Sequence, residues 1–350
     1  MGSVQGSASS SVTGARLPVW VSILARACAK RGARIEIEPI YGYAGSIVGA
    51  DGRRHFFKGT NFDINGAGAA ALAKDKDYAA RFLAEAGLRV PRGLLLHSPA
   101  RRAALRLKNP DVARRLPDNA DALAFAEAAG YPVFVKPNEG SEGDGVMRVG
   151  APDGLDGALA TLFARHERVL VQETVAGRDF RVVVLDGKVL AAFERRPLSV
   201  TGDGSSPLSV LIAHALEGFS AGGRGTRIAA DDPRILSHLA SGGRGPQTVP
   251  ALGEKVALLA NANLSTGGAA VEVSDALSPD FAEAAVRAAA ALGLRFSGVD
   301  LMASGPGDPA PAVLEVNAAP GLSYFHRLGG DAAETVERIY EALLDALLGC

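Results

Sequence analysis

The sequence predicts a mixed α/β (α+β) protein of two or three lobes. Its 350 residues are 47% hydrophobic and 21% charged, which is typical of a globular chain that can bury a large core. Helical stripes alternate along the chain with strand-like runs, and several helical stretches are followed by a glycine, as helix ends often are. The sequence contains no repeat at a fixed period.

Charge and cysteine content exclude several classes of protein. The formal net charge is −1, so no basic field indicates a nucleic-acid partner. No apolar run approaches the ~18 residues needed to cross a bilayer, so we expect no membrane partner. Cys28 and Cys350 lack metal-ligand spacing, which fits a reducing, cytoplasmic setting.

The N-terminal part predicts a tail and a small lobe. Residues 1–16 are rich in serine and glycine without an apolar signal core, so we expect a disordered tail. Residues 17–74 predict a small N-terminal α/β lobe with a helix over 17–32, a strand over 34–38 and a hairpin over 41–60. So short a lobe leaves apolar surface that a partner subunit can cover, which favours a homodimer.

Residues 75–172 predict the first of two larger lobes. A helix over 75–86 should turn Tyr78, Phe82 and Leu83 inward. Its other predicted elements are strands over 94–96, 131–137 and 169–173, a surface excursion over 98–117, and a helix over 118–129 that begins at Asp118.

Residues 173–350 predict the second larger lobe, with an insertion over 201–255. Its last helix should begin at Asp331, with Glu334 completing a capping box. The remaining predicted elements are a hairpin over 180–193, a helical piece over 208–218, a polar loop over 261–268, a helix over 279–293, and strands over 298–302 and 313–317.

The last two of these strands carry the polar pattern that favours a metal site. Glu315 and Asn317 are two residues apart in a strand, so they share a face about 6–7 Å apart, while Leu314 and Val316 should point into the core. If this strand pairs with the one carrying Asp300, two carboxylates and an amide oxygen meet, a set that suits Mg2+. The alternative is a strand whose polar residues simply face solvent.

A glycine-rich loop follows a strand that ends in Lys136. Residues 138–146 contain three glycines and a serine between two strands, which lets backbone N–H groups converge as an anion cradle. The loop lacks the order of a P-loop and the context of a dinucleotide fingerprint. An ordinary glycine hairpin is the alternative, and Lys136 at the entrance favours phosphate binding.

Other titratable residues give weaker signals. Arg195 and Arg196 leave a buried strand, so one of them should point into a cleft. The six histidines show no ligand spacing, and we expect surface or core positions for them, except His326, which is close enough to the 317–321 turn to touch substrate.

Taken in order, several short motifs resemble the ATP-grasp superfamily of carboxylate–amine ligases. The likeness extends from Lys74 to Arg327 and is greatest to the ATP-grasp part of cyanophycin synthetases and of bifunctional glutathione-synthesising enzymes. The motifs are Asp75-Lys76, residues 135–138, 177–181, 194–197, 201–204, 261–268, 298–300 and 314–322.

The resemblance implies an ATP-grasp fold, in which two α/β lobes (75–172 and 173–350) clasp ATP, with the 17–74 lobe beside them. It also implies a role for each matched position. Lys76 and Lys136 would hold ATP phosphates, and a loop containing Gly140, Ser141, Gly143 and Gly145 would close over them. Gln172, Glu173 and Val175 would contact adenine, and Asp179 the ribose hydroxyls. Asp300, Glu315 and Asn317 would bind two Mg2+ ions, with Mn2+ as an alternative. Arg181, Arg195 and Asn263 in its loop would face the γ-phosphate and the acyl substrate.

Two departures from those relatives bear on the substrate. Leu259 stands where the relatives often have an arginine, which removes an anion contact. The second catalytic module of the relatives, Mur-ligase-like or glutamate–cysteine ligase, has no counterpart in this sequence, so we expect one active site.

The function expected from this resemblance is an ATP-dependent ligase that joins an amino acid or short peptide to an amine through an acyl phosphate. The arginines around the site suggest a substrate with an additional carboxylate. The alternatives are a non-catalytic ATP-binding module, and a carboxylase or kinase with the same fold.

Overall fold

The computed structural model describes residues 2–4, 17–140, 143–221 and 228–349 of the chain. They form two compact units, each built from separate segments of the sequence. Unit 1 comprises Met1–Gly66, Val183–Asp275 and Ala319–Cys350, and unit 2 comprises Ala67–Val182 and Ala276–Ala318. The lobe boundaries given above remain a prediction. Across the described residues, none of the helices combines the length and hydropathy that a membrane crossing requires.

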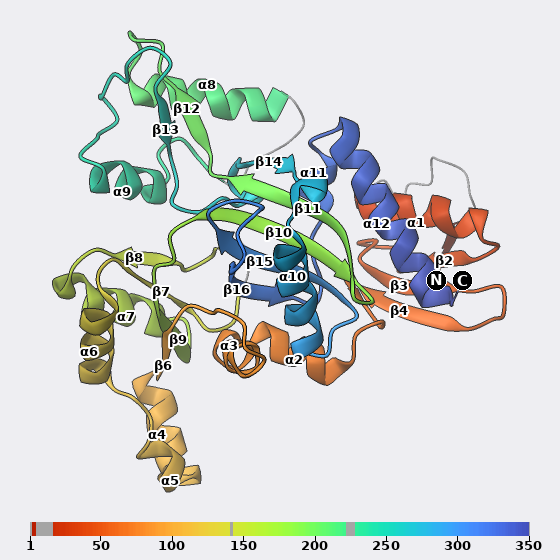
Figure 1. Cartoon of the computed structure of the whole chain (residues 1–350), viewed down its shortest axis with the longest axis horizontal. Helices are drawn as coiled ribbons and strands as arrows, with labels where there is room; N and C mark the ends of the chain where they lie inside the picture. The colour runs from red at the N-terminus through yellow and green to blue at the C-terminus, as the bar shows by residue number, and fades with distance from the viewer. Residues whose placement is uncertain (1, 5–16, 141–142, 222–227, 350) are drawn as a thin grey trace. The chain divides into compact units, whose positions relative to one another are not determined.

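Unit 1 contains an antiparallel sheet of five strands in sequence order (Figure 1). The predicted strand and hairpin are confirmed as β2, β3 and β4. The tail expected to be disordered instead contributes a strand, because Gly2–Val4 pairs with β2; the rest of residues 1–16 lies outside the described residues. The strands are β1 (Gly2–Val4), β2 (Arg34–Ile37), β3 (Ala44–Val48), β4 (Arg54–Lys58) and β5 (Asn61–Phe62).

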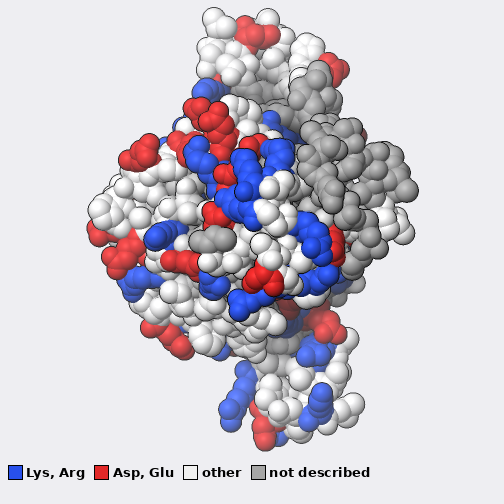
Figure 2. Space-filling view, turned by 90° about the vertical axis from the view of Figure 1, so that its right-hand side faces the viewer, with Lys and Arg blue, Asp and Glu red and all other residues white. Residues whose placement is uncertain are grey.

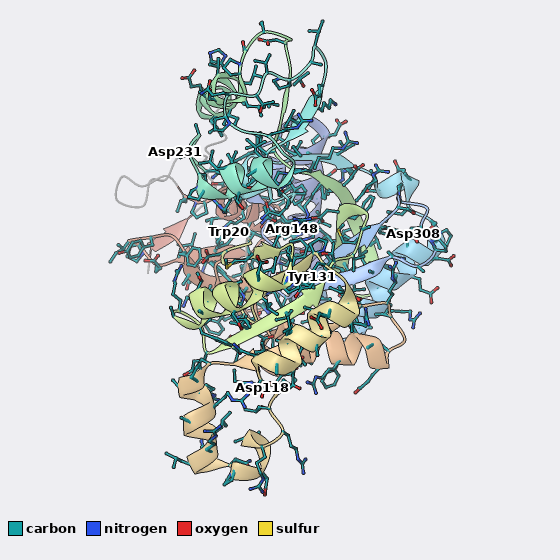
Figure 3. The ribbon with its side chains drawn as sticks, turned by 90° about the vertical axis from the view of Figure 1, so that its left-hand side faces the viewer. Trp20, Asp118, Tyr131, Arg148, Asp231 and Asp308 are labelled. Carbon is teal, nitrogen blue, oxygen red and sulfur yellow. The ribbon has the colours of Figure 1, made fainter. Side chains whose placement is uncertain are left out.

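Two helices pack together beside this sheet, α1 (Val19–Lys30) and α12 (Gly330–Leu348). Trp20 of α1, labelled in Figure 3, packs edge-to-face on Phe57 with ring centroids 5.4 Å apart. The predicted capping box of α12 is wrong: the cap is Gly329, at φ 76°, and no side chain bonds the helix start. Because Gly329 already turns the chain here, Asp331 lies inside the first helical turn.

The insertion in unit 1 has a hydrophobic core of its own. The strands β12 (Ser199–Thr201) and β13 (Lys255–Ala257) pair beside α8 (Leu208–Ala221) and α9 (Pro233–Ser241). Leu259 is only 4% exposed and belongs to this core. Its leucine therefore has a packing role.

A second sheet has the hydrogen-bonded order β14-β11-β10-β15-β16. The predicted hairpin is confirmed as β10 (Arg178–Leu185) and β11 (Lys188–Arg196), and the boundary between the units passes through β10. In unit 1, β11 pairs with β14 (Ala269–Glu272), and Phe193 stacks on Phe325 of α11 (Ser323–His326).

Unit 2 contains a four-stranded antiparallel sheet of order β6-β9-β7-β8. The strands are β6 (Gly93–His97), β7 (Val133–Pro137), β8 (Met147–Val149) and β9 (Arg168–Glu173), as predicted for three of them. One face carries Val133, Val135, Val169 and Val171, all fully buried. Two helices cover that face, α6 (Asn119–Ala129) and α7 (Leu155–Phe163). The other face carries Phe134, Lys136, Leu170 and Gln172, so polar and apolar side chains are mixed on it.

The predicted cap of α6 is confirmed. Asp118, labelled in Figure 3, accepts hydrogen bonds from the backbone of Ala120 and Asp121, and Asp121 completes a capping box. The predicted surface excursion before it forms two short helices, α4 (Pro99–Lys108) and α5 (Pro110–Ala113), and α4 buries none of its residues.

The helices α2 (Ala67–Lys74) and α3 (Lys76–Glu85) lie against β16 in unit 2. Leu83 is buried as predicted, but Tyr78 and Phe82 are 49% and 46% exposed, so the expectation that they face inward is wrong. The inner face of α3 is instead made by Ala79 and Leu83 because the apolar stripe is narrower than the sequence indicated.

The remaining pair of unit 2 is β15 (Phe296–Ala303) with β16 (Ala312–Asn317), covered by α10 (Pro279–Ala291). Phe281 of α10 packs on Phe180 with ring centroids 5.2 Å apart. The register shifts between Asp300 and Leu301, which is the mark of a β-bulge. Leu301 pairs with Val313, so Leu314 has no partner in this register and is half-buried, contrary to the expected core position.

Candidate functional site

The mixed face of the four-stranded sheet carries Lys136 and Gln172. In the β7–β9 register Lys136 pairs with Leu170 and Phe134 with Gln172, so both polar side chains lie on the face opposite the valines. Lys136 Nζ donates to Gln172 Oε1 at 2.6 Å. Burial, opposed by the Glu315 carboxylate and reinforced by the charge of Lys76, lowers the pKa of Lys136 to about 8. A negative charge placed beside Lys136 would therefore stabilise its ammonium form.

Lys76 reaches the same region from α3. Its Nζ lies 3.5 Å from Glu315 Oε1 and donates to the Gly140 carbonyl at 2.9 Å. The side chain is 10% exposed. Lys76 thus links the glycine loop to β16 within unit 2.

The glycine loop has the backbone that only glycine adopts readily. Gly140, Gly143 and Gly145 have φ of 141°, 75° and 69°. A Cβ on Gly145 would lie 2.9 Å from Pro137 Cγ, so this position also needs the space. Ser141, predicted to bind phosphate, lies outside the described residues. A loop of this backbone can turn N–H groups toward an anion.

Asp300, Glu315 and Asn317 share one face of the β15–β16 pair. Asp300 pairs with Glu315 and Gly298 with Asn317. Side chains directly opposite each other in an antiparallel pair have Cβ atoms about 4.5–5.5 Å apart. Asn317 Nδ2 lies 3.4 Å from Asp300 Oδ2. The bulge at Leu314 precedes Glu315, so Glu315 and Asn317 keep the common face expected from the sequence.

Arg181 of β10 binds both oxygens of Asp300. Nε donates to Oδ1, and Nη2 donates to Oδ2 at 2.9 Å. The residues are 9% and 7% exposed, so this is a buried bidentate pair. Arg181 therefore balances the charge of a carboxylate in the predicted metal set.

The donor set fits a magnesium ion. Its side-chain ligands would be hard oxygens from two carboxylates and one amide, the kind that Mg2+ prefers. Among the described residues, no three His, Cys, Asp or Glu side chains cluster as a metal site. An ion held by Asp300, Glu315 and Asn317 would therefore complete its shell with phosphate oxygens and water, as Mg2+ commonly does.

The residues expected near the nucleotide base lie at the end of β9 and just after it, in unit 2. Gln172 is buried and engaged with Lys136, and Val175 is half-buried. The Glu173 carboxylate accepts from the backbone N–H of Arg92 at 2.9 Å and from its Nε at 2.6 Å. Asp179 is half-buried at the start of β10. Their expected roles stay predictions.

Arg195 and Asn263 belong to unit 1. Arg195 is half-buried on β11, whereas Arg196 is exposed and bonds Glu194 at 3.1 Å. The backbone carbonyl of Asn263 accepts from Thr266 and from Gly268, each at 3.2 Å, which closes the polar loop into a tight turn. His326 lies 3.7 Å from Glu337 in the same unit.

Sequence reasoning passed over the residues that hold this arrangement together. Asn138 is fully buried, and Arg168 is partly buried at the start of β9. Both bond Asp75, the residue before Lys76. Asp75 and Asn138 lie in the quoted motifs, but their contacts join positions far apart in the sequence, which no local pattern reveals.

Two family models match separate parts of the chain. The one described as "D-ala D-ala ligase C-terminus" matches residues 112–201, and the one described as "RimK-like ATP-grasp domain" matches residues 259–339. These ranges include Lys136, Gln172 and Arg181 in the first, and Asp300, Glu315 and Asn317 in the second.

Known proteins show the same likeness. A cyanophycin synthetase of Geminocystis herdmanii is 35% identical over 264 residues, which are 72% of this chain and 28% of that protein. A bifunctional glutathione biosynthesis protein of Desulfotalea psychrophila is 25% identical over 334 residues, 92% of this chain and 40% of that protein. The chain thus spans less than half the length of these two relatives.

A solved structure has the same fold. The bifunctional glutathione synthetase of Pasteurella multocida matches with a TM-score of 0.55 and 21% identity, over 93% of this chain and 44% of that chain. The mixed α/β fold predicted from the sequence is confirmed by this match. The chain belongs to the ATP-grasp superfamily of ligases.

Proposed function

We propose that the protein is an ATP-dependent carboxylate–amine ligase that forms an amide or peptide bond and releases ADP and phosphate. The observation that carries this proposal is the grouping in unit 2 of Lys76 and Lys136 with Glu315, beside Asp300 and Asn317 on the same strand pair. Such a site can neutralise a triphosphate and still hold oxygen ligands for its cations. Membership in a ligase superfamily supports it.

The reaction proceeds in two displacements. A carboxylate oxygen of the acid attacks the γ-phosphorus of ATP, the bond to the β–γ bridging oxygen breaks, and ADP leaves. The amine nitrogen of the second substrate then attacks the acyl carbon, phosphate leaves with the former carboxylate oxygen, and the nitrogen loses a proton. Phosphoryl transfer of this kind depends chiefly on positioning and charge neutralisation.

The cationic side chains supply that neutralisation. Lys136 bears a positive charge in a partly buried place, and a phosphate beside it would raise its lowered pKa again. Lys76 would bind a phosphate oxygen in exchange for its Glu315 contact, beside the Gly140 carbonyl that it already bonds. The N–H groups around Gly140, Gly143 and Gly145 would complete the cradle.

Asp300, Glu315 and Asn317 would hold magnesium ions, or Mn2+ in their place. Bound there, the metal supplies Lewis-acid stabilisation of phosphate charge. Arg181 orients Asp300 through its bidentate bond, and its guanidinium would face the γ-phosphate.

The remaining roles rest on the family pattern. Gln172, Glu173 and Val175 would contact adenine, and Asp179 the ribose. Arg195 and Asn263 would contact the acyl substrate. Relatives named for cyanophycin and glutathione synthesis support amino acids or short peptides as substrates. An additional carboxylate on the substrate would suit the arginines.

The test is a product assay over pairs of amino acids and dipeptides with ATP and Mg2+. We expect ADP and phosphate to appear only when both an acid and an amine are present, together with the condensed product. Formation of AMP and pyrophosphate would overturn the acyl-phosphate mechanism. Tight binding of ATP without turnover over the whole panel would favour a non-catalytic nucleotide-binding module.

The expected homodimer remains a proposal. Unit 1 exposes several large side chains, with Ile40 at 66%, Tyr41 at 80% and Phe56 at 59%. A partner subunit covering them would remove this apolar area from water. Figure 2 shows both signs of charge mixed over the face it displays. A monomeric mass in solution would contradict the dimer.

A further inference from the structure

The start of α3 is tied to the end of β7 through one buried asparagine. The backbone N–H of Lys76 donates to the Asn138 carbonyl at 3.2 Å, and that of Asp77 donates to Asn138 Oδ1 at 3.0 Å. The N–H of Tyr78 donates to the Asp75 side chain at 3.1 Å. The N–H of Asp75 donates to the Leu72 carbonyl at 3.1 Å.

All four N–H groups at this helix start are therefore satisfied within the protein. A helix N-terminus is otherwise a ready anion site. Here the N–H groups at the positive end of α3 donate to Asn138 and to the Asp75 carboxylate. At this helix start, a phosphate would therefore be reached by the Lys76 side chain. The placement of Lys76 then depends on how α3 is attached to β7.

The Asp75 carboxylate bonds the side chains of both Asn138 and Arg168. Its Oδ1 accepts from Asn138 Nδ2 at 2.8 Å, and its Oδ2 accepts from Arg168 Nη1 at 2.6 Å. Burial acts to raise the pKa of Asp75, but the bonds from Asn138, Tyr78 and Arg168 outweigh it and hold that pKa below its usual value. The carboxylate is thus ionised, and both of its oxygens accept hydrogen bonds from the protein.

Arg168 extends the connection to the glycine loop. Its backbone carbonyl accepts from the Asn138 N–H at 3.1 Å, and its Nη2 donates to the Glu139 carboxylate. The next residue, Gly140, accepts the hydrogen bond from Lys76 Nζ. The same few bonds therefore fix both partners of that contact, the lysine and the first glycine of the loop.

We propose that Asp75, Asn138 and Arg168 are positioning residues that set Lys76 against the glycine loop for ATP binding. The proposal rests on the proposed function, because it assigns the purpose of the network to the nucleotide. None of the three residues needs to touch ATP. Asp75 and Asn138 are only 6% and 0% exposed, so both are buried away from solvent.

The first test compares Arg168→Gln with Arg165→Gln in the full chain. Both changes remove one positive charge, and Arg165 is an exposed residue just upstream. We expect Arg168→Gln to weaken ATP·Mg2+ binding about tenfold, measured by calorimetry, and Arg165→Gln to change it less than about twofold. ATP binding by Arg168→Gln at wild-type strength would overturn the proposal.

The second test separates positioning from mere stability. In a Lys76→Met background, Arg168→Gln should cause little further loss of ATP affinity, because it acts through Lys76. An equal loss in both backgrounds would show that Arg168 does not act through Lys76. Chemical denaturation of each variant confirms that the folded protein is being compared.

An exchange of side chains gives a rescue. Asn138→Asp sets two carboxylates against each other and should lower ATP affinity more than Arg168→Gln does. Adding Asp75→Asn restores one donor and one acceptor in that bond and should recover part of the affinity; no recovery would contradict the assigned bond. A wild-type protein that binds no ATP·Mg2+ would refute the proposed function instead, so the two failures are distinguishable.

Discussion

Two cationic side chains of unit 2 are held in opposite ways. Lys136 lies on the mixed face of the β7–β9 sheet, bonded to a neutral amide, and its pKa is lowered to about 8. Arg181 lies in a bidentate bond to Asp300 and is compensated by a full negative charge. Lys136 is therefore available to an incoming anion at a cost in stability, whereas the charge of Arg181 is already paired and would share Asp300 with any metal ion.

The largest expected effect is on turnover, where a change at Lys136 and a change in the metal set that Arg181 contacts should act alike. Lys136→Met and Glu315→Ala should each lower kcat/KM by at least about two orders of magnitude. Lys136 would itself balance charge on the transferring phosphoryl, and Glu315 would hold the metal ion that does so. Steady-state ADP release measures this. Lys108→Met is the matched control on the exposed helix α4 and should retain wild-type activity. Retention of most activity by Lys136→Met would refute the assigned role.

The free energy of unfolding should respond differently to changes at the Arg181–Asp300 pair and at Lys136. Asp300→Ala leaves the Arg181 charge buried without its carboxylate and should cost about 3–5 kcal/mol of unfolding free energy. The double variant Arg181→Met with Asp300→Leu should recover most of that loss. Lys136→Met should cost far less, because it also removes a charge that burial disfavours. Urea denaturation measures all three. An equal loss of unfolding free energy in Asp300→Ala and Lys136→Met would contradict the stated difference between the two side chains.

The smallest effect is a pH dependence that only Lys136 should give. Its folded pKa of about 8 lies below the ordinary value of 10.5, so above pH 8 the unfolded chain binds a proton that the folded chain has lost. Stability from this group therefore rises with pH between those values. The difference between wild type and Lys136→Met should shift in favour of wild type by about 1–2 kcal/mol from pH 7.5 to 9.5. Urea denaturation at both pH values tests it, and an unchanged or falling difference would contradict the lowered pKa.

Local pattern was enough for most of the elements. The capped helix after Asp118, the hairpin at Asp186 and the Glu315–Asn317 strand follow from cap chemistry, turn residues and alternation, which act over a few neighbouring residues. Where packing decides, pattern was insufficient. Tyr78 and Phe82 have the spacing of a buried stripe, yet both side chains stay about half exposed because no other element in the described part of the chain covers that side of α3.

For the site, local pattern was enough to identify the chemical groups: two lysines, a glycine loop and an acid–acid–amide set on two strands. Their partners became known from the folded chain, such as Arg181 with Asp300, Lys136 with Gln172, and Asn138 with the start of α3. The cause is the range over which each interaction acts along the sequence. Caps, turns and strand faces depend on residues a few positions apart, whereas a buried charge takes whichever partner the folded chain brings to it, from any distance along the sequence.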